Sequence, residues 1–361
     1  MAGKNPKRER KSGSGIAHRE SNIAKISLTI ALPEERKYFH EFVSARTSWK
    51  VPSERDGAYF CTLGTEDGPV RVRVNTLSSM GQTEAVLGAA AAISAESPDL
   101  AVMIGIAGSM QPTQVGLGDV VLCNQVKFFG SDKVGSLSPS GPYVLGRNLN
   151  GRLAGQVVVD DRDKFMESSF LRYERSFVES SHAGELVAEV ETRLMNCPLR
   201  QLNPDWLDDS IAGLDSSKRN RKIHVGWILG SAHVVDSREY RDYLNEKNTQ
   251  LDLDIHRQKG EVGRVQWKEG QLLAVDMESY GLIRAAEMYR SIPSHKGGCN
   301  QLIGAVSVRG ISDLCEDKGA LDAKSKNEVR RLAMHNATEV ALSLLENLDY
   351  KQLADAKRSQ L

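Results

Sequence analysis

The sequence predicts a three-layer α/β/α fold with a central mixed sheet and a long, partly helical insertion. Apolar segments of strand length, rich in Val, Ile and Leu and without polar alternation, are typical of strands covered on both faces. They span residues 26–32, 70–76, 100–106, 120–126, 223–229, 272–275 and 302–308. Helical patterns occur at residues 33–43, 82–95, 277–289 and 329–348. This alternation places helices on both faces of one sheet.

The helices are predicted from their first residues and from their apolar spacing. Pro33 stands early in the first helix, where a proline fits because the N–H that it lacks would have no partner there. The segment 82–95 is rich in alanine, a strong helix former. The last helix has the clearest pattern, because its apolar residues recur at i, i+3 and i+4 from Val329 to Leu348.

Length and composition favour a folded protein with a small-molecule ligand. The 361 residues suffice for one large α/β domain or two ordinary ones, and 40% hydrophobic residues are too many for a disordered chain. The 47 basic and 47 acidic residues give a formal net charge of +0, so no overall field attracts nucleic acid or anionic lipid. We therefore expect neither nucleic acid nor a membrane as a partner.

The cysteines and the hydropathy predict a cytoplasmic protein. The five cysteines are widely spaced and form no CxxC or Cys/His cluster, which favours a reducing compartment. No apolar stretch reaches the length of a membrane span, and the N-terminus lacks the apolar core of a secretory signal. We expect no metal site and no cofactor.

Composition predicts one domain over residues 23–350, with an insertion at about 136–222. Residues 1–22 are polar and basic and are expected to form a disordered leader, and residues 351–361 a flexible tail. The insertion is polar, charged and too long for a connection within a compact domain. A lid, an oligomer contact and a mobile segment all remain open as its role.

Candidate site residues follow two of the predicted strands. Gly105 and Gly108 at the end of one strand would let a ligand approach the backbone closely, although a glycine-rich strand end is also an ordinary turn. Asp276 and Glu278 follow the strand 272–275, where carboxylates can also simply cap the next helix.

A third segment ends in Arg309, Ser312 and Asp313 after the apolar strand 302–308. Open α/β sheets bind their ligands outside the carboxyl ends of their strands. Charged residues at this position therefore indicate a site.

Together these segments resemble the nucleoside phosphorylase and 5′-methylthioadenosine/S-adenosylhomocysteine nucleosidase family. The family pattern has Gly-Ala-Gly followed by Gly-Asp-Val-Val, a Met-Glu pair after a strand, and Val-Arg-x-Ile-Ser-Asp near the C-terminus. The counterparts occur here in the same order, as Ala107-Gly108, Gly118-Asp-Val-Val121, Met277-Glu278 and Val308-Arg-Gly-Ile-Ser-Asp313. The resemblance covers residues 26–348 without most of the insertion, and it implies a nucleoside-phosphorylase-like fold.

The resemblance implies a role for each matching residue. Asp313 matches the acid that protonates the purine at N7, with Ser312 beside it. Glu278 and Met277 match the pair that holds the ribose hydroxyls and packs on the sugar, and Glu34 matches the carboxylate that orients the attacking water. The other substrate-binding positions are Ser78 near the ribose or the nucleophile, Ala107, Gly108 and Arg309 at the strand ends, and His233, Val234 and Val235 along the purine.

The chemistry of the reaction gives these residues consistent tasks. Cleavage of a purine N-glycosidic bond passes through an oxocarbenium-like sugar, and the base leaves poorly without a proton. Asp313 must therefore hold or share a proton near neutral pH, which burial favours. Glu278 would offer negative charge to the sugar cation. Glu34 would polarise water on the opposite face, although a carboxylate in a first helical turn also simply favours the helix dipole.

Water is predicted as the nucleophile, because the segments 31–35 and 76–81 contain no arginine that would bind phosphate. The predicted function is therefore that of a purine nucleosidase, which hydrolyses the N-glycosidic bond of adenosine, methylthioadenosine, AMP or ATP. A phosphate-dependent phosphorylase, with Arg71, Arg73 or Arg309 reaching the site, is one alternative. A non-catalytic nucleoside-binding regulatory module is the other.

The sequence does not determine the chemical group at the 5′ position of the substrate. A basic cluster precedes the strand 223–229 and would either bind a 5′-phosphate or polyphosphate or form a solvated turn; it comprises Lys218, Arg219, Arg221 and Lys222. The resemblance also implies a homodimer or a larger homo-oligomer, in which a neighbouring copy completes the pocket.

Overall fold

The computed structural model describes most of the chain. The described residues are 24–52, 58–66, 68–135, 154–157, 169–207, 220–246, 248, 271–291, 304–351 and 353. The predicted leader, nearly all of the predicted tail, part of the insertion and Cys299 lie outside them.

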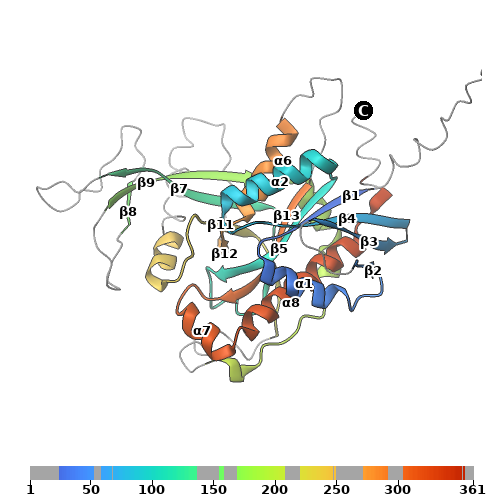
Figure 1. The fold of residues 1–361 in the computed structure, drawn as a ribbon. Helices are drawn as coiled ribbons and strands as arrows, with labels where there is room; N and C mark the ends of the chain where they lie inside the picture. The colour runs from blue at the N-terminus through green and yellow to red at the C-terminus, as the bar shows by residue number, and fades with distance from the viewer. Residues whose placement is uncertain are drawn as a thin grey trace, which may run out of the picture.

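A mixed sheet forms the centre of the molecule (Figure 1). Its described strands are β1 (Lys25–Ile30), β2 (Trp49–Lys50), β3 (Tyr59–Thr65), β4 (Gly68–Thr76), β5 (Leu100–Ser109), β6 (Val120–Cys123), β7 (Gln125–Gly135), β8 (Ala154–Val157), β9 (Ser169–Glu179), β10 (Ile223–Val225), β11 (Trp227–Gly230), β12 (Leu272–Asp276) and β13 (Gly304–Asp313). They follow the order β2-β3-β4-β1-β5-β12-β11-β7-β9-β8, and β13 pairs with β5 and with β6, which also pairs with β10.

The carboxyl ends of three strands meet at Gly108. β5 runs parallel to β13, which sets Asp313 opposite Gly108. β12 crosses the end of β5 in the antiparallel sense, with Val275 opposite Gly108. Side chains that follow β5, β12 and β13 therefore gather at one place.

Helices cover both faces of the sheet, which confirms the three-layer prediction (Figure 1). The described helices are α1 (Pro33–Val43), α2 (Gln82–Glu96), α3 (Ser181–Leu194), α6 (Ser279–Ser291), α7 (Lys318–Ser325) and α8 (Glu328–Asn347), with a short 3-10 turn, η2 (Pro204–Trp206). α2 and α6 lie on one face, and α1, α3 and α8 pack into the hydrophobic core of the other. None of the described helices is long and apolar enough to cross a membrane.

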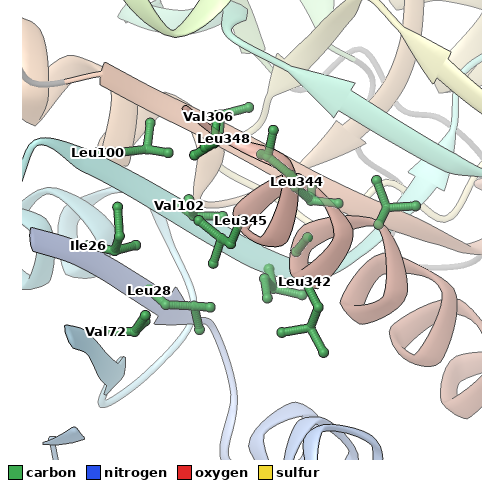
Figure 2. Close-up of a cluster of buried hydrophobic side chains, with 14 of the residues drawn as sticks. Ile26, Leu28, Val72, Leu100, Val102, Val306, Leu342, Leu344, Leu345 and Leu348 are labelled. Carbon is green, nitrogen blue, oxygen red and sulfur yellow. The ribbon is translucent and has the colours of Figure 1, made fainter. Parts of the chain in front are cut away.

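The central strands are buried on both sides, and their side chains alternate between two cores. Leu100, Val102 and Ile104 of β5 pack into the core on the α8 side. Ala101 and Met103 of the same strand pack into the core beneath α2 and α6. Figure 2 shows the α8 side, where leucines of α8 lie beside β5 and β13, in one core with Ile26 and Leu28 of β1 and Val72 of β4. A strand buried on both faces has a continuous apolar sequence, which is why these strands could be predicted from the sequence.

The element boundaries differ from the predicted ones in informative ways. The helix predicted at 33–43 is confirmed, and the one predicted at 329–348 matches α8 within one residue at each end. The strand predicted at 302–308 continues as β13 to Asp313, so that Arg309 and Asp313 belong to the strand itself. The apolar runs at 120–126 and 223–229 each contain two strands, because the chain bends at Asn124 and at Gly226.

Part of the predicted insertion belongs to the main body. The partly helical character expected of it is confirmed by α3, whose apolar side chains pack into the core beside α8. They are Ala183, Leu186, Val187, Val190 and Leu194. β9 of this region also pairs antiparallel with β7, which ends just before it, from Gln125 opposite Glu179 to Gly135 opposite Phe170.

The packing of α8 on β13 requires a glycine at position 310. A Cβ atom there would collide with the backbone carbonyl of Ala333. We expect Gly310→Ala to lower the free energy of unfolding by about 1–3 kcal/mol or more, measured by urea denaturation. Gly319 in α7 is the control, because a Cβ there meets nothing within 4 Å. Gly319→Ala should leave stability unchanged or raise it by up to about 1 kcal/mol; equal effects of the two substitutions would contradict this account.

Candidate active site

A cleft opens where β5, β12 and β13 end, and carboxyl groups dominate its polar lining. Its empty volume is about 560 Å³, part of which is open to solvent. The cleft is lined by Ala31, Leu32, Glu35, Met80, Ile106, Ala107, Gly108, His233, Val234, Val235, Val275, Asp276, Met277, Glu278, Ser312, Asp313, Lys318 and Arg330.

The turn from β12 into α6 supplies Asp276, Met277 and Glu278. Asp276 lies at the strand end and accepts hydrogen bonds from the backbone N–H of Ser279 at 3.1 and 3.2 Å, which is how a carboxylate caps a helix. Glu278 is 4% exposed, and its Oε1 accepts from the Gly81 N–H at 3.2 Å. The capping interpretation thus holds for Asp276, whereas Glu278 faces the cleft.

Arg309 lies behind these two carboxylates and is completely buried. Its Nε is 2.7 Å from Asp276 Oδ2, and its Nη2 is 3.4 Å from Glu278 Oε2. A Cβ at Gly105 would collide with Nη1, so this glycine makes room for the guanidinium. Arg309 is absent from the cleft lining and instead pairs with the two carboxylates that line it.

Gly108 has a similar steric role. A Cβ there would lie 2.7 Å from Asp313 Oδ1 and 2.6 Å from Cys315 Sγ. The glycines of this strand end therefore leave space for the site's own charged side chains, besides any close approach of a ligand.

Glu35 is the carboxyl group that α1 directs into the cleft. It is 4% exposed, and its Oε2 accepts from the Leu32 N–H at 3.3 Å. Burial raises the pKa of Glu35 to about 7, against the lowering effect of Arg309 and together with the raising effect of Glu278. Burial also raises the pKa of Glu278, opposed by Arg309 and reinforced by Asp276. The carboxyl groups of Glu35 and Glu278 therefore lie close together in one small, poorly hydrated region.

Glu34, which the sequence analysis placed on the attacking water, lies outside the cleft lining. Its side chain is 45% exposed, 3.7 Å from Arg330 Nη1, and it accepts a hydrogen bond from Tyr38 Oη at 3.1 Å. The signal that distinguishes the two glutamates is present in the sequence. Glu35, Phe39 and Val43 recur every four residues and are the buried face of α1, and residues so spaced share one side of a helix.

Asp313 ends β13 and is 2% exposed. Its Oδ1 accepts from the Cys315 N–H at 3.1 Å, and its Oδ2 lies 2.9 Å from Ser312 Oγ and 3.0 Å from Lys318 Nζ. Lys318 is the first residue of α7 and was not singled out from the sequence. The acid expected to face the purine is therefore paired with an ammonium group.

The predicted base-binding segment also reaches the cleft. His233, Val234 and Val235 line it, and the segment is braced by Ser231 Oγ, which accepts from the His233 N–H at 3.1 Å. Ser78 is different: it is exposed, hydrogen-bonds to Glu84 and is absent from the lining, where Met80 of the same turn stands instead.

The arginines considered as phosphate ligands lie elsewhere. Arg71 stacks over the Phe60 ring at 3.6 Å, and Arg73 Nη1 is 3.3 Å from Glu96 Oε1. Arg221 is buried and donates to the Leu117 carbonyl, whereas Lys218 and Arg219 lie outside the described residues. Within the described part of the chain, no group of three or more His, Cys, Asp or Glu side chains is arranged to hold a metal ion.

A mixed three-layer fold with buried acids at the crossing of its strand ends defines an α/β protein with a small-molecule cleft. A sequence model of the phosphorylase superfamily matches residues 25–346. The chain belongs to this superfamily.

Solved structures with a similar chain path include three bacterial hydrolases. A variant of the Helicobacter pylori 5′-methylthioadenosine/S-adenosylhomocysteine nucleosidase with 5′-methylthioadenosine in its active site has 16% identity and a TM-score of 0.49, over 90% of this chain and 99% of that chain. The futalosine hydrolase of the same organism has 14% identity and a TM-score of 0.48, over 90% of this chain and 99% of that chain. The 5′-methylthioadenosine/S-adenosylhomocysteine nucleosidase of Neisseria meningitidis has 13% identity and a TM-score of 0.48, over 90% of this chain and 100% of that chain. No curated protein sequence is significantly similar to this chain.

Arg309 is the only positive charge that we find in contact with Asp276 and Glu278 among the described residues. Replacement by methionine would leave these carboxylates buried without their counter-ion, and we expect Arg309→Met to cost about 3–5 kcal/mol of stability at neutral pH. The pKa of Glu278, which burial already raises, would rise further above its unfolded value, so that stability is lost as pH rises. The loss should therefore be smaller at pH 5 than at pH 8, as measured by urea denaturation. A loss independent of pH would show that Arg309 contributes only by packing.

Proposed function

We propose that this protein is a purine nucleosidase, which uses water to release the base from an adenine nucleoside or nucleotide. The observation that carries the proposal is the presence in one cleft of two buried carboxyl groups from separate elements, Glu35 of α1 and Asp313 of β13. Glycoside hydrolysis with water as the nucleophile uses such a pair, one as base and one as acid. Membership of the phosphorylase superfamily agrees with chemistry at a glycosidic carbon.

Glu35 takes the role of the base. It removes a proton from water as the oxygen of that water bonds to C1′ of the ribose. A base whose pKa of about 7 lies near the working pH is present as carboxylate and is still basic enough to accept the proton. The position beside Glu278 places this charge near the sugar, where positive charge develops in the transition state.

Glu278 holds the ribose. Gly81 and Arg309 engage its two oxygens and fix the carboxylate in one orientation. The remaining lone pairs accept hydrogen bonds from the 2′- and 3′-hydroxyls, and Met277 beside it in the lining packs on the sugar. A carboxylate held rigidly in a site of low polarity stabilises an oxocarbenium-like sugar without having to reorganise.

Asp313 takes the role of the acid. As the C1′–N9 bond breaks, its electron pair passes into the purine ring. The protonated Asp313 carboxyl group gives its proton to N7, and the carboxylate left behind pairs with Lys318 Nζ. Ser312 and the Cys315 N–H fix the two oxygens of this group. His233, Val234 and Val235 bound the space that the purine ring would fill.

The charge distribution favours water over phosphate as the nucleophile. Glu35, Asp276 and Glu278 line one region of the cleft, and Arg309 lies behind them with its charge already matched. Arg71 and Arg73 are outside the lining. A phosphate ion approaching C1′ from the Glu35 side would meet carboxylates at short range, which repel it.

Release of free base is the direct test of this function. The purified chain is incubated with adenosine, methylthioadenosine, AMP and ATP, with and without phosphate, and free adenine is separated by chromatography. We expect adenine from at least one substrate without phosphate, and a loss of at least about 100-fold in Asp313→Asn. Strict dependence on phosphate with ribose 1-phosphate as product would establish a phosphorylase instead. Ligand binding without any turnover would favour a binding module.

The two neighbouring glutamates give a matched pair of variants. Glu35→Gln should lower kcat by about 100- to 10,000-fold, because the base is lost. Glu34→Gln should change kcat by less than about threefold, because that side chain lies outside the cleft lining and surface pairs contribute little. Base release by each variant is followed under the same conditions. A larger loss in Glu34→Gln than in Glu35→Gln would reverse the assignment.

The raised pKa of Glu35 predicts the pH profile. Only the ionised carboxylate accepts a proton, so kcat/KM should rise with pH and level off above about 7. The same rise of kcat/KM with pH, the acidic limb of the profile, should remain in Glu34→Gln. A profile without this limb between pH 5 and 8 would show that Glu35 is not the base.

A further inference from the structure

Two cationic side chains line the cleft, and the proposed reaction gives them no substrate to bind. They are Lys318 at the start of α7 and Arg330 in the first turn of α8. We propose that these two side chains bind a phosphate ester at C5′, so that the substrate is a purine nucleotide rather than a nucleoside. The inference rests on the proposed N-glycosidase function and names the substrate class of that same site.

Lys318 is held beside the acid that faces the base. Its Nζ lies 3.0 Å from Asp313 Oδ2, and its backbone N–H donates to Asp236 Oδ1 at 2.9 Å. The second bond ties the first residue of α7 to the chain that follows the base-binding segment. The ammonium group is therefore fixed at the N7 side of the bound purine, and its side chain is still 25% exposed for a further ligand.

Arg330 lies close to Lys318 and is incompletely paired. Its Nη1 is 3.7 Å from Glu34 Oε2, which is beyond hydrogen-bond distance, and its buried Nε–H has no hydrogen-bond partner among the described residues. Burial and the charge of Arg330 both lower the pKa of Lys318, and Asp313 outweighs them by raising it. Two cations that repel each other at the edge of a cleft are stabilised by an anion between them.

The stereochemistry of a nucleotide brings its 5′ group to this place. The base and the C5′ carbon project from the same face of the ribose ring, whereas the 2′- and 3′-hydroxyls lie on the other face. In the anti conformation, the C8–N7 edge of the purine lies over the C5′ side of the sugar. A cation next to the carboxyl group that faces N7 is therefore on the side of the 5′ substituent, and Glu35 and Glu278 serve the opposite face.

The chemistry of the two groups fits a phosphate. A guanidinium donates hydrogen bonds in a planar fork that matches two phosphate oxygens, and an ammonium supplies a compact point charge. An uncharged thioalkyl group would offer neither cation an anionic partner. Glu34 is the counter-ion that a phosphate would replace, and its 45% exposure means that this pair is weak and easily exchanged.

The test compares nucleotide with nucleoside in neighbouring arginine variants of the full chain. Base release is measured for the pairs AMP and adenosine, and IMP and inosine, which covers both common substituents at C6. We expect kcat/KM of the wild-type protein to favour the nucleotide at least about 10-fold. Arg330→Gln should lower this preference about 10- to 100-fold, mainly through KM for the nucleotide, and Arg330→Lys should restore part of it.

Arg331→Gln is the matched control. This next residue on α8 pairs with Glu41 and lies 3.7 Å from Glu328, outside the cleft lining. It should leave the preference within about twofold of wild type. Lys318 is not substituted, because it contacts the proposed catalytic acid and its loss would change the chemistry as well as the binding.

The outcomes separate this inference from the proposed function. Equal kcat/KM for nucleotide and nucleoside, or a preference unchanged in Arg330→Gln, would overturn the phosphate site while base release still supports the nucleosidase. If no pair releases base, the nucleosidase proposal is wrong, and calorimetry of AMP and adenosine binding decides the remaining question. Tighter binding of AMP that is lost in Arg330→Gln would support the phosphate site, and equal binding would overturn it.

Discussion

The Arg309 guanidinium is fully buried between Asp276 and Glu278, and the geometry of the cleft depends on this ion pair. This one cation interacts with a third carboxyl group as well, because the charge of Arg309 also lowers the pKa of Glu35. Burial raises the pKa of Glu35 to about 7, because it outweighs the lowering effect of Arg309, whose charge is shared with Asp276 and Glu278. The buried ion pair thus limits the rise in the pKa of this neighbouring carboxyl group without cancelling it.

A second pair of opposite charges stands at the other side of the site. Asp313 and Lys318 lie 3.0 Å apart at the end of β13. The site therefore separates two environments: one rich in carboxyl groups, where a sugar cation would be stabilised, and one with accessible ammonium and guanidinium groups. A formal net charge of +0 for the whole chain conceals this division, because the local excesses cancel in the sum.

Much of the architecture was predictable because strands buried on both faces and amphipathic helices leave periodic patterns. The helix at Pro33–Val43 is an example. The predicted site residues Ala107, Gly108, His233, Val234, Val235, Met277, Glu278, Ser312 and Asp313 do gather in one cleft. Their catalytic and binding roles remain proposals. The strands β2 and β3 were missed. β2 is a two-residue edge strand, and β3 alternates buried and more exposed side chains, so neither gives a continuous apolar run.

The sequence by itself determined which segments form buried strands and which charged residues lie toward their carboxyl ends, since these properties depend on neighbours along the chain. Only the tertiary structure decided the rest. The spacing of Glu35, Phe39 and Val43 already separates Glu35 from Glu34, but only the packing of α1 shows that Glu35 lines the cleft and Glu34 does not. Lys318 and Arg330 join the site through the packing of α8 against β13 and of α7 against α8, far from Glu34 and Glu35 in sequence. Contacts between distant segments, such as that of Arg330 with Glu34, leave no local pattern in the chain.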